Sequence, residues 1–124
     1  TSIAGKLPGP YQSVYHGTKA FVHSFTEAIH SEIKESEVII TSLLPGVTDT
    51  DFFNKASMQS SKIVQEGEMA DPADVARDGY EALNKGKDKV ISGIKNKVEV
   101  AMSNVTPDSK VADKLKKQQA PVNK

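Results

Sequence analysis

The sequence predicts an α/β fold with a parallel sheet, of which this chain carries about half. Two short apolar runs, residues 37–45 and 89–93, have the composition of buried strands. Helical patterns precede, separate and follow these runs, and strands that alternate with helices are typical of parallel βαβ units. Two strands make an incomplete sheet, and the chain opens at Thr1 in a loop rich in glycine and proline. We therefore expect a fragment that continues from an upstream strand.

The first predicted helix runs from Ser13 to Lys34. Residues suited to one buried face recur along it at steps of three and four. These residues are Thr18, Val22, Phe25, Ile29 and Ile33. We expect this face to lie on the sheet, with Ser13 capping the first turn.

The middle of the chain is predicted to hold the two strands and a second long helix. The strand over residues 37–45 ends at Pro45-Gly46, and a polar loop with one short helical turn follows it. Asp71-Pro72 has the pattern of a helix cap followed by proline in the first turn, and Gly86 ends that helix. The second strand, residues 89–93, comes directly after it.

The last part of the chain is predicted to be helical in two pieces. Residues 96–105 form a helix, and Pro107 starts a lysine-rich segment with only Val111 and Leu115 to bury. Such a segment has too few apolar residues for much docking. We therefore expect residues 106–124 to be a solvated, frayed helix or flexible tail, with a partner-binding tail as the alternative.

The composition excludes several classes of function. Sixteen Lys and Arg residues balance sixteen Asp and Glu residues, so no net charge attracts nucleic acid or an anionic membrane. The absence of cysteine excludes disulfides, thiolate metal sites and cysteine nucleophiles. No apolar run approaches the roughly 18 residues of a membrane span. A cytoplasmic setting is the simplest expectation.

Three histidines, His16, His23 and His30, are spaced by seven residues on the first predicted helix. Seven residues correspond to about 10.5 Å of helical rise, so two of these side chains cannot bind one metal ion. Only a symmetry-related helix would bring histidines together. We expect no metal site and interpret the histidines as a polar or interfacial edge of the helix.

Tyr15 and Lys19 lie four residues apart, on one face of the same helix. A neighbouring ammonium stabilises a phenolate and lowers the pKa of a tyrosine from its usual value near 10. A tyrosine tuned in this way can act as an acid or base near neutral pH. On its own, however, such a pair is more often part of a helix surface than a catalytic dyad.

Two further features flank this pair. Ser2 lies just after the presumed upstream strand, and the PGVTDT loop of residues 45–50 follows the first predicted strand. Ligands bind at the carboxyl ends of strands in open α/β sheets, so both features are expected at a ligand site. Taken singly, Ser2 is a loop or capping serine, and Thr50 is equally suited to capping the turn that starts at Asp51.

Together these features resemble the short-chain dehydrogenase/reductase family. The signatures of that family are a serine ahead of a Tyr-x-x-x-Lys helix, then a Pro-Gly loop with a threonine five residues past the proline. The sequence matches them with Ser2, Tyr15, Lys19, Pro45-Gly46 and Thr50. The resemblance extends through residues 71–93, and it implies that residues 1–124 are the C-terminal, catalytic part of a Rossmann-like, doubly wound parallel sheet.

The resemblance also implies a reaction, namely hydride transfer between NAD or NADP and a small-molecule carbonyl or alcohol. Tyr15 would act as the general acid or base, and Lys19 would lower its pKa and hydrogen-bond the nicotinamide ribose. Ser2 would stabilise the charge that develops on the substrate oxygen.

The cofactor contacts implied by the resemblance lie in the loop after the first strand. Pro45, Gly46, Val47 and Thr48 would supply backbone around the nicotinamide. The Thr50 hydroxyl would bind the carboxamide. The family often has valine in place of Thr48, but the contact there is mainly through the backbone. The loop from Phe52 to Glu68 would cover the substrate.

The sequence departs from the family where the cofactor is anchored. It lacks the glycine-rich turn that binds the pyrophosphate, the Asn-Asn-Ala-Gly stretch and the residue that selects NAD or NADP. We therefore expect the 124 residues alone to fold poorly and to be inactive. The Tyr15 helix packs in a subunit-interface bundle in the family, which implies a homodimer or homotetramer.

Two other functions remain open. A binding module that keeps the fold without its chemistry would lack a catalytic group, whereas Ser2, Tyr15 and Lys19 are all present. A nucleotide-sugar epimerase of the related extended group shares the Tyr-x-x-x-Lys motif. The Pro-Gly-Val-Thr-Asp-Thr loop and the short tail favour the simple reductase.

Overall fold

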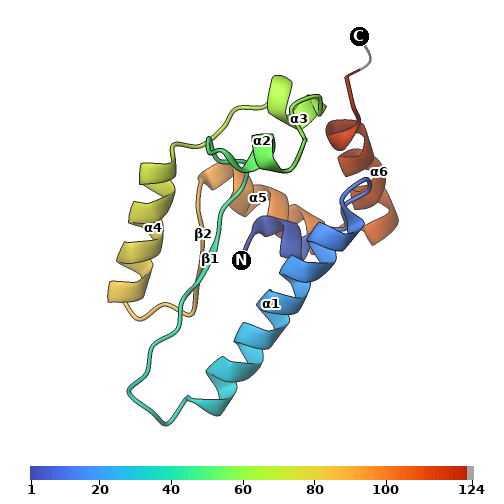
Figure 1. The fold of residues 1–124 in the computed structure, drawn as a ribbon. Coiled ribbons are helices and arrows are strands. Elements are labelled where there is room, and N and C mark those ends of the chain that lie inside the picture. The colour runs from blue at the N-terminus through green and yellow to red at the C-terminus, as the bar shows by residue number, and fades with distance from the viewer. Residues whose placement is uncertain (123–124) are drawn as a thin grey trace.

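The computed structural model describes residues 1–122, which form helices around a pair of strands (Figure 1). In chain order the elements are a 3-10 helix η1 (Ile3–Lys6), α1 (Ser13–Glu32), β1 (Ser42–Leu44), α2 (Phe52–Lys55), α3 (Lys62–Gln65), α4 (Pro72–Asn84), β2 (Lys89–Ile91), α5 (Ile94–Ser103) and α6 (Asp108–Gln119). This order of helices and strands agrees with the predicted one.

Strands β1 and β2 pair in parallel, with Leu43 opposite Val90. Helix α4 connects them, so β1, α4 and β2 form one βαβ unit. In Figure 1, α4 and α1 lie on opposite sides of the strand pair. A small parallel sheet between helices is part of a Rossmann-like fold, and the predicted α/β class is confirmed.

Both strands are shorter than predicted. The prediction of a strand over residues 37–45 is wrong outside Ser42–Leu44, and β2 ends at Ile91 rather than at residue 93. Val38 and Ile39 are 62% and 56% exposed. A strand that is apolar on both faces needs a neighbour on each side. Among residues 1–122, β1 pairs with β2 alone, which explains why the strand stops early.

Helix α4 begins and ends as predicted. The Asp71 carboxylate accepts a hydrogen bond from the Ala73 N–H at 2.7 Å, and Pro72 occupies the first turn. Gly86 follows the C-cap with a φ of 61°. Glycine adopts this left-handed conformation without steric cost, which ends the helix.

Helix α1 also begins where predicted, but it buries a different face. Its N-cap is Gln12, so the predicted cap at Ser13 is wrong. The buried side chains are His16 and His23, whereas Phe25 of the predicted core stripe is 57% exposed. The histidine face turns inward because η1 and the loop after it pack against α1. The interpretation of these two histidines as a polar edge is therefore wrong.

Helix α6 docks on the rest of the molecule. Val111 and Leu115 form a buried cluster with Leu7, which precedes α1. The prediction of a solvated, frayed tail is therefore wrong for the helix, and residues 123 and 124 of that segment lie outside the described residues. Two apolar side chains one turn apart suffice for docking because Leu7 supplies their partner.

The apolar core is small. Leu44 of β1, Val75 of α4 and Val100 of α5 are buried, but large apolar side chains on the outer faces of α1 and α5 are exposed. Among residues 1–122, no helix combines the length and the apolar character needed to cross a membrane.

Candidate active site

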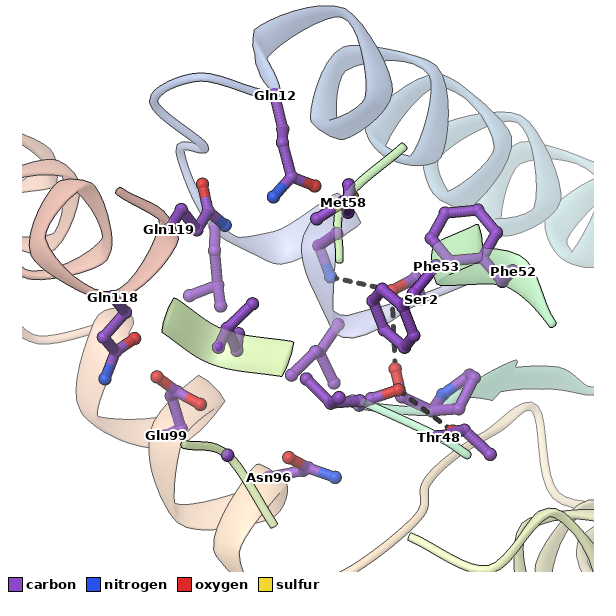
Figure 2. A pocket seen from close by; sticks show the side chains of 18 of the residues that line it. Ser2, Gln12, Thr48, Phe52, Phe53, Met58, Asn96, Glu99, Gln118 and Gln119 are labelled. Carbon is purple, nitrogen blue, oxygen red and sulfur yellow. Dashed lines mark hydrogen bonds between the residues drawn. The ribbon is translucent and has the colours of Figure 1, made fainter. Parts of the chain in front are cut away.

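A cavity of about 720 Å³ lies where the chain leaves the carboxyl end of β1. Figure 2 shows side chains that point into it from η1, the segment after β1, α5 and α6. This volume is typical of small-molecule and cofactor sites, which measure roughly 300–1,000 Å³. The predicted site residues that line it are Ser2, Tyr15, Pro45, Gly46, Val47, Thr48 and Thr50. Lys19 is the predicted site residue that does not line it.

The close packing of η1 on α1 brings Ser2 to the helix of Tyr15. A Cβ atom added to Gly5 would lie 2.7 Å from the carbonyl oxygen of Lys19, so a larger residue would push the two helices apart. The Thr1 hydroxyl donates to the same carbonyl at 3.3 Å. Glycine at position 5 therefore fixes the distance between the serine and the tyrosine helix.

Ser2 is buried and caps η1. Its Oγ accepts a hydrogen bond from the Ala4 N–H at 3.1 Å and donates to the Pro45 carbonyl at 3.4 Å. The second distance is long for an O–H···O bond, so this contact is weak. The Pro45 carbonyl also accepts the Ile3 N–H at 3.1 Å and does not depend on Ser2. The capping interpretation of Ser2 is confirmed, and its proton makes only the weak contact with Pro45.

Tyr15 is half-buried between Lys19 and the segment after β1. The Lys19 Nζ lies 5.4 Å from the centroid of the Tyr15 ring, and the Phe52 ring centroid lies 5.6 Å from it. The ammonium thus stands over the phenol ring rather than in the cavity. The predicted proximity of phenol and ammonium on one helix face is confirmed, while their chemical roles stay predictions.

The loop after β1 is held in place by Ala70, which lies two residues before α4. The Ala70 N–H donates to the Val47 carbonyl at 2.9 Å, and the Ala70 carbonyl accepts the Asp49 N–H at 3.0 Å. Thr48 and Ala70 thereby form a parallel bridge, and the Thr48 hydroxyl donates to the Gly46 carbonyl at 3.1 Å. The loop is a fixed wall of the cavity.

Helix α5 approaches this wall at Gly46. A Cβ atom there would lie 2.5 Å from the side-chain amide of Asn96. The Asn96 amide donates to the Ser92 carbonyl at 2.7 Å, which holds it beside the loop. Asn96 is a lining residue that the sequence did not predict.

The segment that begins at Thr50 continues into the short helix α2. The Thr50 hydroxyl accepts the Phe52 N–H at 3.4 Å, a long contact that agrees with a weak capping role. Hydrogen bonds from Asn54 and Lys55 hold the pKa of Asp51 below its ordinary value. Thr50 itself is exposed, so its hydroxyl proton is available to a ligand.

Residues of α5 and α6 line the cavity without belonging to any motif. Glu99, Gln118 and Gln119 surround one end of it in Figure 2. Gln118 and Gln119 lie three and four residues after Leu115, so they share its helix face and turn inward with it. This spacing can be read from the sequence, but it predicts that the two glutamines face inward only if Leu115 is known to be buried.

Two of the three histidines of α1 bind backbone groups. His16 Nδ1 lies 2.7 Å from the Leu7 carbonyl, and His30 Nε2 contacts the Ile40 carbonyl. Burial, followed by the nearby positive charge of Lys6, lowers the pKa of His23. Within the described part of the chain, no group of three or more His, Asp or Glu side chains could hold a metal ion.

The comparison with protein families gives a match over the part of the chain that holds these motifs. The model of the short chain dehydrogenase family matches residues 1–61. Among curated proteins, the very-long-chain 3-oxoacyl-CoA reductase of Rattus norvegicus is 42% identical over 45 residues, or 36% of this chain and 14% of that protein. Sulfoacetaldehyde reductase 2 of Chromohalobacter salexigens is 37% identical over 51 residues, or 41% of this chain and 20% of that protein.

A longer and weaker match reaches into the second half of the chain. Dehydrogenase/reductase SDR family member 7B of Mus musculus is 29% identical over 98 residues, or 73% of this chain and 30% of that protein. The chain thus spans less than a third of the length of each of these relatives. No solved structure gives a significant match. The family match and the Ser2, Tyr15 and Lys19 pattern agree, and the chain belongs to the short-chain dehydrogenase/reductase family.

Proposed function

We propose that the protein is an oxidoreductase that transfers hydride between NAD(P)(H) and a carbonyl or alcohol substrate. The observation that carries this proposal is that two residues with hydroxyl groups line one cavity. Ser2 and Tyr15 come from different elements, yet both line the cavity beside the loop of residues 45–50. Membership of the family and the reductase names of two of its relatives support the same reaction class.

Ser2 is suited to bind the substrate oxygen. The Ala4 N–H holds its Oγ in place, and its own proton makes only the 3.4 Å contact with Pro45. Donation to a substrate oxygen therefore replaces a weak bond, and the Pro45 carbonyl keeps the Ile3 N–H. A fixed donor of this kind stabilises the negative charge that develops on the oxygen during reduction.

Tyr15 is suited to move the proton. In reduction its hydroxyl gives a proton to the carbonyl oxygen as hydride reaches the carbonyl carbon, and in oxidation the phenolate takes the proton back. The Lys19 ammonium lies 5.4 Å from the ring centroid, on the same helix face as the phenol. Phe52 covers the ring from another side and limits its access to water.

The residues present fit the nicotinamide end of a dinucleotide cofactor. Residues 46–49 form a wall that the bridge to Ala70 fixes, and the Thr50 hydroxyl beside it is exposed. Gly46 keeps the wall free of a side chain where α5 approaches. Bound NAD or NADP would supply or accept the hydride. Thr50 would hold its carboxamide, with Lys19 on the ribose.

The segment after Thr50 gives the cavity an apolar wall, and we propose that this wall faces the substrate. Phe52, Phe53 and Met58 line it, and they come from the segment after Thr50. We propose a substrate whose carbonyl or alcohol carbon carries an apolar group, because these side chains favour apolar contacts.

We further propose that the protein is a homodimer or homotetramer that pairs through α1. Phe21 and Phe25 stack at 6.2 Å between centroids on the outer face of this helix, where Val14 is also exposed. Analytical ultracentrifugation of the natural full-length protein would show a dimer or larger species, and Phe21→Lys should shift it towards the monomer. A wild-type protein that sediments as a monomer would contradict the proposal.

The reaction is tested by mixing the full-length protein with NADH or NADPH and a panel of aldehydes and ketones. The expected result is substrate-dependent loss of the reduced-cofactor absorbance with at least one cofactor. Binding of reduced cofactor, followed by its fluorescence, separates a failed substrate choice from a failed cofactor assignment. A protein that binds neither cofactor would sink the proposal.

A further inference from the structure

The end of the chain meets the segment that covers the cavity. We define the lid as residues 52–68, which contain α2 and α3. The Lys62 N–H donates to the Ala120 carbonyl at 3.0 Å, and the Val122 N–H donates to the Ser60 carbonyl at 2.8 Å. Ser61 and Pro121 thereby form an antiparallel bridge, and α3 packs against α6. We call these two bonds the clasp.

The lid cannot hold its position by its own helices. Helices α2 and α3 have four residues each, which is too short for an independently stable helix. The bridge between Thr48 and Ala70 pins the two ends of the lid together but leaves its middle free. The clasp is a second fixed point, and it acts on the middle of the lid.

The clasp is anchored to the helix that carries Tyr15. The Leu7 carbonyl can only accept, so His16 Nδ1 donates to it at 2.7 Å and His16 Nε2 is left as an acceptor. Gln119 Nε2 lies 3.3 Å from that atom and donates to it. Gln119 immediately precedes the clasp, and His16 immediately follows Tyr15.

We infer that residues 120–122 position the lid over the cavity and so set how substrate is held against Ser2 and Tyr15. Lid residues Phe53 and Met58 line the cavity, so movement of the lid changes the substrate wall. The clasp is also linked to α1, because Gln119 precedes it and hydrogen-bonds His16. The lid is therefore fixed relative to Tyr15. The inference rests on the proposed function for its kinetic readout only.

The first variant removes one clasp bond without touching a helix bond. Lys62 is the first residue of α3, where proline is tolerated, and Ser61 already has extended angles of φ −74° and ψ 142°. Lys62→Pro deletes the N–H that binds Ala120. Lys62→Ala is the matched control, because it loses the same side chain and its exposed ion pair with Glu66 but keeps the N–H.

The second variant removes both bonds. A stop codon after Gln119 deletes the two partners of the clasp, and a stop codon after Val122 keeps them. In the protein that ends at Gln119, we expect the hydrogen exchange rate of lid amides to rise about tenfold, because both backbone hydrogen bonds of the clasp are lost. We expect Lys62→Pro to show a smaller rise, and both controls to match the wild type.

Kinetics then show whether the lid holds the substrate. For a ketone reduced by the wild type, we expect KM to rise several-fold in the clasp variants while kcat stays within about twofold. Exchange and KM equal to those of the two controls would overturn the inference. If the wild type reduces no carbonyl, the proposed function fails, whereas the exchange comparison still decides whether the clasp holds the lid.

Discussion

Residues 1–61 and residues 62–122 line the same cavity but contribute different things to it. The first part carries Ser2, Tyr15 and the Pro45 loop, and it is the part that the family model matches. The second part carries no motif, yet Asn96 and Gln119 line the cavity from it. The proposed chemistry thus rests on local motifs, whereas the shape of the cavity depends on helices that pack from far along the chain.

The largest effect is expected from the motif part. Tyr15→Phe removes the proton that the substrate oxygen needs, so turnover should fall by about 10²–10⁴-fold in the full-length enzyme while cofactor binding persists. Steady-state kinetics and cofactor fluorescence measure the two quantities. Tyr11→Phe is the control, because Tyr11 is exposed and does not line the cavity. Near-normal turnover of Tyr15→Phe would remove the tyrosine from the mechanism.

The second prediction tests whether α6, in the part of the chain without motifs, is docked on the molecule or frayed. Leu115→Ala empties space next to Leu7 and Val111 and should destabilise α6 by about 2–5 kcal/mol. Hydrogen exchange of α6 amides would report the loss. Val98→Ala, at an exposed position of α5, should stay within about 0.5 kcal/mol of the wild type. Equal exchange in the two variants would restore the frayed-tail interpretation.

A third test moves Ser2 relative to Tyr15 without changing either residue. Gly5→Ala places a Cβ 2.7 Å from the Lys19 carbonyl oxygen, so η1 must shift on α1. We expect a loss of about 1–3 kcal/mol in unfolding free energy and a fall in kcat with little change in cofactor affinity. Gly17→Ala has no atom within 4 Å of its new Cβ and should stabilise α1 slightly. Unchanged kcat in Gly5→Ala would count against the paired hydroxyl groups.

The smallest effect concerns stability against pH. Burial, then Lys6, lowers the pKa of His23, with Lys89 acting in the same direction and Glu27 opposing. The unfolded chain therefore binds this proton more readily. The contribution of neutral His23 to the free energy of unfolding is fully present above the pKa of histidine in the unfolded chain, roughly 6.5. It is lost as the pH falls through the lower pKa of His23 in the folded protein.

His23→Gln should flatten this dependence in denaturant titrations between about pH 7 and pH 5. His30→Gln is the control for loss of a histidine from the same helix. An unchanged slope in His23→Gln would show that another group is responsible.

The features predicted correctly from the sequence are those with local causes. The start of α4 follows from Asp71 and Pro72 and its end from Gly86, so neighbouring residues suffice. Tyr15 and Lys19 come together for the same reason, because helix geometry places residues four apart on one face. The class of fold follows from the alternation of strands and helices.

The features predicted wrongly depend on distant partners. The length of β1 is set by β2. The buried face of α1 is set by η1 and the loop after it, which lie on the histidine side of the helix rather than on the apolar stripe. Docking of α6 depends on Leu7, more than a hundred residues before it in the chain. None of these contacts can be predicted from the residues of β1, α1 or α6 alone, because the partner lies elsewhere in the chain.

Isotopic labelling can detect the proposed hydride transfer beside Ser2 and Tyr15 in the product itself. The full-length protein would be given NADH or NADPH deuterated at the transferable position, together with a ketone that it reduces. We expect deuterium on the former carbonyl carbon of the alcohol product, and almost none with Tyr15→Phe over the same time. Cofactor oxidation without deuterium in the product, or equal labelling by the variant, would contradict it.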